Sequence, residues 1–258
     1  MEINLVVLNA GNTRLAIGVF EAGELTYVTR VANDQRADWA GKLAEAWGRI
    51  KDSENPAIAG ASVNPVILEG LEHVVKQTTG QSIQWVGRDI DLPIKVLTTE
   101  PRETGVDRLL GVAAAYEQLN KACVVVDAGT AVTVNLCNDA GEFLGGAIAP
   151  GASMMLAALH QQTAKLPLVE FTPPPEGAIG RDTAEALRVG VFHAIRGLVK
   201  EVVEAYATQL GTWPELIATG GEAVKLFEGW ELVHAISPDL ILYGIALAYT
   251  NHYLENEG

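Results

Sequence analysis

The chain has 258 residues, of which 48% are hydrophobic and 19% charged, as in an ordinary globular protein with one large core or two smaller ones. Its formal net charge of −14 argues against the basic face with which proteins bind nucleic acids or anionic membranes. The two cysteines, Cys123 and Cys137, are too few for a disulfide framework or a zinc site, so we expect small buried apolar residues.

The chain start and its apolar runs indicate the compartment. Met1–Val7 runs directly into an apolar segment without the basic region of a signal peptide. No apolar run reaches the roughly 18–20 residues of a membrane span. We therefore expect a cytoplasmic protein with neither a membrane nor a nucleic acid as partner.

The N-terminal half predicts the order β-β-β-α-β-α-β. Turns at Gly11-Asn12 and Ala22-Gly23 separate the first three strands, and apolar residues at spacings of three and four follow between residues 39 and 50, as in an amphipathic helix. Pro65 suits the first turn of the next helix. The expected strands are Leu5–Leu8, Leu15–Phe20, Leu25–Arg30, Ala57–Val63 and Ile83–Val86, and the expected helices are 39–50, 66–78 and 106–120.

The second half begins again with three strands. A short helix to Leu159, a polar proline-rich stretch from Phe171 to Gly180 and a long amphipathic helix follow. The remaining expected elements are the strands 123–126, 132–136, 143–148 and 216–218 and the helices 183–210 and 239–254.

An internal repeat relates the two halves. Residues 5–25 align without a gap to residues 123–143, and each copy has a strand, a polar tip containing Ala-Gly, a second strand and an Ala-Gly-Glu turn. We therefore expect an α/β protein with two duplicated βββαβα-type domains, 1–118 and 119–258, around an interdomain cleft. This architecture resembles the actin-like ATPase (ribonuclease H-like) fold of the sugar-kinase superfamily.

The two polar tips are candidate phosphate-binding loops. Gly11 and Gly129 would let the backbone approach an anion where a Cβ atom would intrude, and Asn12, Thr13 and Thr130 add neutral donors. Ordinary β-turns use the same residue types, which leaves a purely structural turn as the alternative. Two such tips at equivalent places in a duplicated chain favour phosphate binding.

Asp107 and Arg108 open the helix that joins the halves. A carboxylate there could cap the helix or interact with its dipole. Alternatively, Asp107 could accept the proton of a substrate hydroxyl while Arg108 neutralises a transferring phosphoryl group or holds a substrate carboxylate.

The motifs in order resemble those of the type III pantothenate kinases, also called the Bvg accessory factor family, over nearly the whole chain. The matching segments are Asn9–Thr13 (NAGNT), Ser62–Pro65 (SVNP), Pro101–Arg108 (PxxxGxDR), Asp127–Thr133 (DxGTAxT), Gly145–Gly151 (GGxIxPG), Leu166-Pro167, Gly180–Thr183 (GxxT) and Thr219–Ala223 (TGGxA).

The resemblance implies ATP-dependent phosphorylation of pantothenate to 4′-phosphopantothenate, the first step toward coenzyme A. It implies Asp107 and Arg108 as catalytic residues and Asp127 as the ligand of a monovalent cation, K⁺ or NH₄⁺, with Mg²⁺ accompanying ATP. It also implies a homodimer in which the partner subunit supplies Thr183. The long helix that begins beside Thr183 would suit the dimer interface, although its apolar stripe is more simply explained as part of the core. The implied ATP-binding residues are Asn9, Ala10, Gly11, Asn12, Thr13, Arg14, Leu15, Ala16, Gly129 and Thr130, and the implied substrate-binding residues are Thr98, Gly105, Val106, Asp107, Arg108 and Thr183.

Three positions depart from the family pattern. Asn9 replaces an aspartate that would help to hold magnesium, Asn135 stands where a second aspartate is frequent, and Thr98 replaces a tyrosine of the pantothenate pocket. Two interpretations follow. The chain is a working kinase, or it is a catalytically impaired relative that binds nucleotide or pantothenate and has a regulatory or structural role. The retained Asp107 and Arg108 favour the enzyme.

Overall fold

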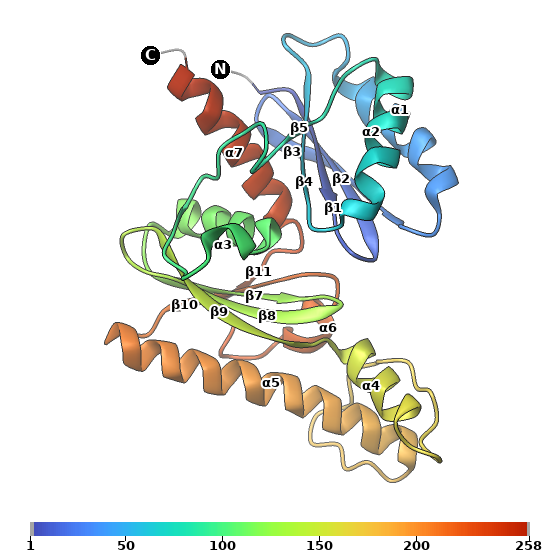
Figure 1. Ribbon diagram of the computed structural model, residues 1–258. Helices are drawn as coiled ribbons and strands as arrows, with labels where there is room; N and C mark the ends of the chain where they lie inside the picture. Colours follow the sequence, from blue (N-terminus) through green and yellow to red (C-terminus); the bar gives the residue numbers. More distant parts are fainter. Residues whose placement is uncertain (1–2, 257–258) are drawn as a thin grey trace. The chain divides into compact units, whose positions relative to one another are not determined.

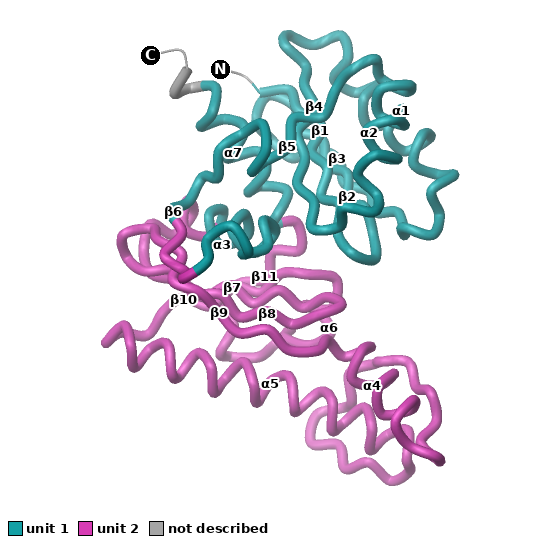
Figure 2. Tube along the Cα trace, viewed as in Figure 1, with its two compact units in different colours: residues 1–95, 100–114, 240–258 teal, residues 96–99, 115–239 magenta. Residues whose placement is uncertain are grey.

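The computed structural model describes residues 3–256 (Figure 1). The chain divides into two compact units, drawn in different colours in Figure 2. Unit 1 comprises residues 1–95, 100–114 and 240–258, and unit 2 comprises residues 96–99 and 115–239. Each unit is built around its own sheet.

The sheet of unit 1 has five strands in the order β3-β2-β1-β4-β5. β1 pairs antiparallel with β2 and parallel with β4, so the carboxyl ends of β1 and β4 lie at the same edge. The strands are β1 (Leu5–Ala10), β2 (Arg14–Glu21), β3 (Glu24–Ala32), β4 (Ala57–Ser62) and β5 (Gln84–Trp85).

Helices cover both faces of this sheet. The central strand β1 is therefore apolar on both sides: Val6 and Leu8 pack with residues of α1 and α2, whereas Leu5 and Val7 pack with residues of α7. In Figure 1, α1 and α2 lie on one side of the strands and α7 on the other. The helices with residues in this unit are α1 (Trp39–Ile50), α2 (Pro65–Thr79), α3 (Val106–Leu119, of which 106–114 belong to unit 1) and α7 (Leu240–Asn256).

The sheet of unit 2 has six strands in the order β11-β10-β7-β8-β9-β6. Its core lies between the strands and α4, α5 and α6, where Val124 and Val126 meet Val191 and Ile195. The strands are β6 (Lys95–Val96), β7 (Cys123–Ala128), β8 (Ala131–Cys137), β9 (Glu142–Pro150), β10 (Glu215–Thr219) and β11 (Ala235–Ile236), and the helices are α4 (Ala152–Gln161), α5 (Thr183–Leu210) and α6 (Ala223–Phe227).

The predicted duplication is confirmed by the strand order, because β9-β8-β7-β10-β11 repeats β3-β2-β1-β4-β5. The tips differ in length. Asn9 pairs with Ala16, seven residues later, whereas Asp127 pairs with Thr133, six residues later. The second tip is thus one residue shorter than the first, which the ungapped sequence alignment does not reveal.

The next turn restores the alignment. Phe20 pairs with Leu25, five residues later, whereas Cys137 pairs with Phe143, six residues later. A β-bulge lies at the same place in both hairpins, directly before Phe20 and directly before Cys137. The longer turn therefore compensates for the shorter tip, and the offset of the repeat is unchanged from β3 and β9 onward.

The structure differs from the sequence prediction in two elements. The C-terminal helix α7 was expected in the second domain, but it belongs to unit 1, where Leu242 and Ile245 pack against the β1 face. The short strand β6, within the loop expected from Leu92 to Thr104, extends the sheet of unit 2 beside β9. The expected boundary at residues 118 and 119 lies in α3, which spans the division of the units.

The two cysteines are buried and free, as the sequence analysis expected. Cys123 and Cys137 face each other across β7 and β8. Hydrogen bonding with Cys137, together with burial, raises the pKa of the Cys123 thiol far above its ordinary value. Among the described helices, none combines the length and the apolar character needed to cross a membrane.

Candidate functional site

The first polar tip joins β1 to β2 in unit 1. A hydrogen bond from the backbone N–H of Gly11 to the carbonyl of Arg14 (3.1 Å) closes the loop around Asn12 and Thr13. Asn12, Thr13 and Arg14 are exposed, so their side chains are accessible to a ligand. Asn33, at the end of β3, donates its side-chain amide to two carbonyls of this tip, a contact that the sequence analysis missed.

The remaining residues of the first motif lie in the strands. Ala10, Leu15 and Ala16 are buried in the sheet, so they could contribute to ligand binding only through the backbone. Asn9 is half-buried at the end of β1. Its amide has no hydrogen-bond partner among the described residues, which leaves it available to a ligand or to water.

The SVNP segment lies beside this tip. Ser62 Oγ donates to the carbonyl of Ala10 (3.1 Å), which fastens the end of β4 to the end of β1. Asn64 then caps α2, because its side chain accepts the N–H of Val66 (3.1 Å), and Pro65 occupies the first turn as predicted. The segment therefore fixes the edge of the sheet at which the first tip projects.

Asp107 lies in the first turn of α3. Its Oδ1 accepts the backbone N–H of Arg108 (2.8 Å). Burial raises the pKa of the Asp107 carboxyl above its ordinary value, although that hydrogen bond and the Arg108 charge act in the opposite direction. A carboxylate with a raised pKa in the first turn of a helix is a candidate proton acceptor.

Gly105 brings the Asp107 turn close to the SVNP segment. A Cβ atom at Gly105 would lie 2.8 Å from Asp107 Oδ1 and 3.8 Å from the side chain of Val63. A larger residue would therefore displace the carboxylate. Within unit 1 the structure thus brings together three of the predicted motifs: the first tip, SVNP and Gly105–Arg108.

The second polar tip joins β7 to β8 in unit 2. The backbone N–H of Gly129 donates to the carbonyl of Ala131 (3.0 Å), which leaves Thr130 exposed at the apex. The N–H of Gly151 donates to the carbonyl of Thr130 (3.0 Å) from the end of β9. The predicted GGxIxPG segment is therefore part of the support of this tip.

The TGGxA segment supports the same tip from the end of β10. Gly220 has a φ of +94°, and a Cβ atom there would overlap Asp127 Oδ1 and the carbonyl of Ala128. Glu222 donates its backbone N–H to the carbonyl of Ala128 (2.9 Å). Its side chain accepts from Ser153 Oγ (3.1 Å) at the start of α4. The Asp127 carboxylate thus lies among backbone oxygens of closely packed loops.

The glycines at the two tips differ from those that support them. Gly11 and Gly129 do not have a positive φ, and added Cβ atoms would first meet protein atoms at 3.4 Å and 3.8 Å, which are tolerable distances. A Cβ at Gly151, in contrast, would overlap the carbonyl of Gly129. The fold thus requires glycine at 151 and 220 but not at 11 and 129, where a ligand gives a better reason for it.

The other predicted residues occupy unit 2. Asn135 is buried, and its amide donates to Thr133 Oγ1 (2.9 Å), a bond that an aspartate could not make. Thr98 lies beside β9, about 4.0 Å from the Cβ position of Gly145. Thr183 is exposed at the start of α5, directly after the N-cap Asp182, and its side chain makes no hydrogen bond to another described residue.

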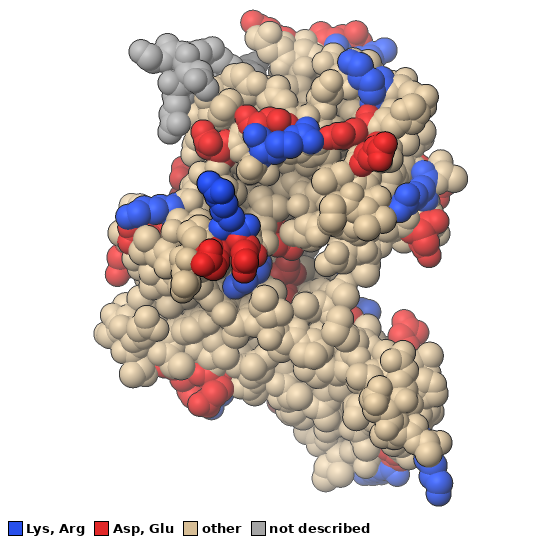
Figure 3. Space-filling model, viewed as in Figure 1, with Lys and Arg blue, Asp and Glu red and all other residues tan. Residues whose placement is uncertain are grey.

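Charged side chains are scattered over the face that Figure 3 draws. On the described face drawn in Figure 3, basic side chains lie singly or next to acidic ones, without a continuous basic patch. Among the described residues, no group of three or more His, Cys, Asp or Glu side chains is arranged to hold a metal ion. A cation at Asp127 would therefore depend on backbone, hydroxyl, ligand or water oxygens.

Comparisons with known proteins indicate one family over nearly the whole chain. The family model of the type III pantothenate kinases matches residues 5–205. A type III pantothenate kinase of Dehalococcoides mccartyi is 34% identical over 96% of this chain and 98% of its own length. One from Syntrophotalea carbinolica is 32% identical over 98% of this chain and 100% of its own length.

Solved structures identify the fold. A Baf family transcriptional activator from Campylobacter jejuni superposes with a TM-score of 0.61 at 22% identity, covering 98% of each chain. Component A of the Acidaminococcus fermentans (R)-2-hydroxyglutaryl-CoA dehydratase gives 0.56 at 15% identity, covering 99% of this chain and 100% of its own. Both support the actin-like ATPase fold that the element order predicted. The chain belongs to the type III pantothenate kinase family.

Proposed function

We propose how individual residues carry out the reaction of this family. The chain is a kinase that uses ATP to phosphorylate pantothenate, yielding 4′-phosphopantothenate for coenzyme A biosynthesis. The observation that best supports the residue roles is the convergence of the first tip, SVNP and the Asp107 turn at one strand edge. No feature of the described site favours the alternative of an impaired binding protein.

Asp107 is the proton acceptor in this proposal. Phosphoryl transfer requires the substrate hydroxyl to lose its proton as its oxygen attacks the γ-phosphorus of ATP. Burial raises the pKa of Asp107, which makes the carboxylate a better base than a fully solvated one. Arg108 neutralises charge on the transferring phosphoryl group or holds the carboxylate of pantothenate.

The two tips bind the phosphates of ATP. Backbone N–H groups at glycine turns bind anions without a net positive charge, which suits a chain with a net charge of −14. Arg14 is exposed beside the first tip and supplies a fixed positive charge. That the two tips face one another across a cleft stays a prediction.

The oxygen atoms near Asp127 indicate which cations this site would bind. The Asp127 carboxylate lies beside backbone carbonyls at the TGGxA loop, and an all-oxygen set suits a hard cation such as K⁺ and can also accept hydrogen bonds from NH₄⁺. Mg²⁺ would be bound mainly by ATP and water, because Asn9 contributes no charge. The monovalent cation would neutralise the phosphates; Asp127 would hold and orient it.

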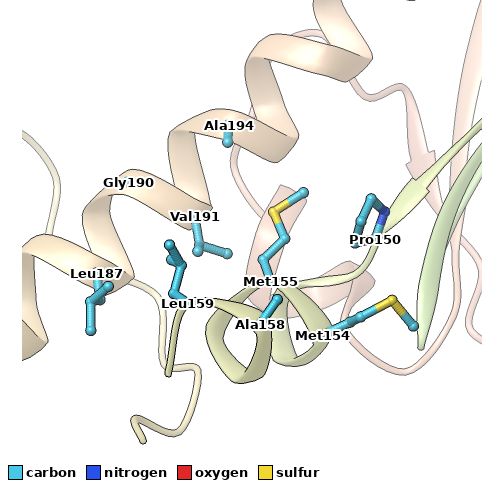
Figure 4. A pocket seen from close by; sticks show the side chains of 9 residues that line it. All are labelled: Pro150, Met154, Met155, Ala158, Leu159, Leu187, Gly190, Val191 and Ala194. Atoms are coloured by element: carbon cyan, nitrogen blue, oxygen red, sulfur yellow. The ribbon is translucent and has the colours of Figure 1, made fainter. Parts of the chain in front are cut away.

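A homodimer in the cytoplasm completes the proposal. The α4 and α5 helices leave a mainly apolar pocket of about 550 Å³ between Met154, Leu159 and Val191 (Figure 4). Met154 and Leu159 are exposed for apolar residues, and a second copy would bury them. The exposed Thr183 would then contribute to the pantothenate pocket of the partner, while Thr98, Gly105 and Val106 would line that of their own subunit.

A turnover assay tests the function. The purified chain is incubated with Mg²⁺–ATP and pantothenate in potassium and in sodium buffer, and phosphopantothenate is measured by mass spectrometry. We expect product in both buffers and a higher rate in potassium. Product in neither buffer, with ATP binding intact, would show that the chain is a binding protein; equal rates would remove the potassium site but not the kinase.

A further inference from the structure

Asn33 is attached to the first tip by three hydrogen bonds. Its backbone N–H donates to the carbonyl of Thr13 (2.9 Å). Its side-chain Nδ2 donates to the carbonyls of Gly11 (2.9 Å) and Asn12 (3.0 Å). One residue at the end of β3 thus contacts three consecutive carbonyls of the loop.

These bonds determine where the loop directs its donors. The structure contains no cis peptide among its described residues, and in a trans peptide the N–H points opposite to the carbonyl of the preceding residue. Since the carbonyls of Gly11 and Asn12 point toward Asn33, the N–H groups of Asn12 and Thr13 point away from it. Two successive N–H groups turned to the same side are suited to bind an anion.

In unit 2, an equivalent hydrogen bond holds the second tip, but no side chain takes part in it. The repeat places Gly151 at the position of Asn33, and Gly151 N–H donates to the carbonyl of Thr130 just as Asn33 N–H donates to Thr13. The second tip is one residue shorter, and a Cβ atom at Gly151 would overlap the carbonyl of Gly129. The longer first tip leaves space for a side chain at this position, and the Asn33 amide fills it.

The orientation of the amide is well determined by its surroundings. Reversing it would place the amide oxygen against two carbonyl oxygens, which repel it. In the present orientation Oδ1 is buried and lacks a hydrogen-bond partner among the described residues. A buried acceptor without a partner destabilises the fold. The two bonds from Nδ2 to the tip are therefore formed at the cost of leaving Oδ1 unpaired.

We propose that Asn33 is a positioning residue for ATP: it holds the Asn9–Arg14 tip so that the N–H groups of Asn12 and Thr13 face the phosphates. This inference rests on the proposed role of the tip in ATP binding. Asn33 itself contacts neither ATP nor pantothenate; it acts through the loop. Its loss should therefore weaken ATP binding without a matching effect on pantothenate.

The test compares two isosteric substitutions in the same unit. Asn33→Asp removes both Nδ2 donors and places a carboxylate against carbonyl oxygens. Asn4→Asp is the matched control, because Asn4 also donates its amide to a backbone carbonyl, that of Glu54 (3.2 Å), and accepts the N–H of Ala22 (3.1 Å) at the opposite end of the hairpin. The neutral variant Asn33→Ser, which retains one donor, covers the case in which the charge prevents folding.

The dissociation constant of Mg²⁺–ATP is measured by calorimetry on the full chain, and the two KM values are measured by turnover. For Asn33→Asp we expect the dissociation constant and the KM for ATP to rise about ten-fold or more, as when one charge-assisted hydrogen bond is lost. The KM for pantothenate stays within two-fold, Asn33→Ser is intermediate, and Asn4→Asp binds ATP like the wild type.

Two results would overturn the inference. If Asn33→Asp and Asn33→Ser both bound ATP within two-fold of the wild type, the hydrogen bonds of the Asn33 side chain would not position the loop. An equal loss in Asn4→Asp would show a general effect of stability. A wild-type chain that binds ATP without turnover would instead contradict the proposed function, while the ATP affinities would still decide the role of Asn33.

Discussion

Substituting Gly129 by alanine separates what the ligand requires from what the fold requires. The added Cβ atom would lie 3.8 Å from Asp127 Oδ1 and 3.9 Å from the carbonyl of Ala131, and the φ of Gly129 is not positive. Neither contact is repulsive, so the free energy of unfolding should change by less than about 1 kcal/mol, and the reduced freedom of the unfolded chain favours a small gain.

ATP binding should respond very differently. A phosphate bound to backbone N–H groups approaches the chain more closely than a methyl group allows, so the methyl group would displace it by roughly 1 Å. Displacement of that size lowers the rate about 10²-fold, or about 2.7 kcal/mol of transition-state stabilisation. We therefore expect kcat/KM for ATP to fall about 10²-fold in Gly129→Ala at nearly unchanged melting temperature.

Two further glycines serve as references. Gly151→Ala places a Cβ 2.6 Å from the carbonyl of Thr130 and into overlap with that of Gly129, so it should lose about 1–3 kcal/mol of stability as well as ATP binding. Gly48→Ala lies on the exposed side of α1 with no atom within 4 Å of the new Cβ, so it should keep activity and gain up to about 1 kcal/mol.

Thermal melts and steady-state kinetics on the three glycine variants measure the effects on stability and on the use of ATP separately. If Gly129→Ala retained the ATP kinetics of the wild type, the second tip would not approach a phosphate. If it unfolded like Gly151→Ala, the conclusion that the fold has space at Gly129 would be wrong.

Two other substitutions test the carboxylates. Asp107→Asn should lower kcat by about 10²–10⁴, the usual contribution of a general base. Because burial raises the folded-state pKa of Asp107 above its unfolded value, ionising it destabilises the fold progressively as the pH rises between these two pKa values, and fully above them. Melting curves should therefore show Asp107→Asn as more stable than the wild type at pH 7, with a smaller difference toward pH 4; a less stable variant at pH 7 would contradict the burial argument. Asn9→Asp should lower the Mg²⁺ concentration needed for half-maximal rate and change kcat only a few-fold, whereas a gain of ten-fold or more would mark the wild type as impaired.

Much of the fold could be predicted because the local patterns are strong. The repeated strand, tip and strand segments predicted both hairpins, and the order of the elements predicted the duplicated α/β architecture that the shared strand order of the two units confirms. Pro65 marked the start of α2 correctly, because its ring geometry and missing N–H favour the first helical turn.

The parts that the sequence did not reveal depend on contacts between distant segments. α7 is apolar on nearly all sides, so its pattern does not indicate which sheet it covers, and only packing assigns Leu242 and Ile245 to unit 1. β6 has two residues, too few for a strand pattern. The different lengths of the two tips were hidden in the sequence, because the next turn differs by one residue in the opposite sense and the repeat aligns without a gap.

In the candidate site, too, local patterns indicated some residues, whereas contacts between distant segments revealed others only in the structure. Residue types and spacing indicated Asp107 and the tip glycines as candidates, whereas the role of Asp127 was implied by the family resemblance; the roles of all of them stay predictions. Asn33 was missed because an asparagine after a strand is common in turns, and its contacts with Gly11 and Asn12 lie more than twenty residues away in sequence. Extending the repeat beyond residue 25 would have paired Asn33 with Gly151 and suggested a shared role.

The most direct test of the account is a crystal structure with a nonhydrolysable ATP analogue and pantothenate. The deciding measurement is the distance from the Asp107 carboxylate to the 4′-hydroxyl of pantothenate. We expect a hydrogen bond of about 2.6–3.2 Å, with the phosphates bound by backbone N–H groups of both tips. A hydroxyl out of reach of Asp107, or phosphates bound away from the tips, would contradict it.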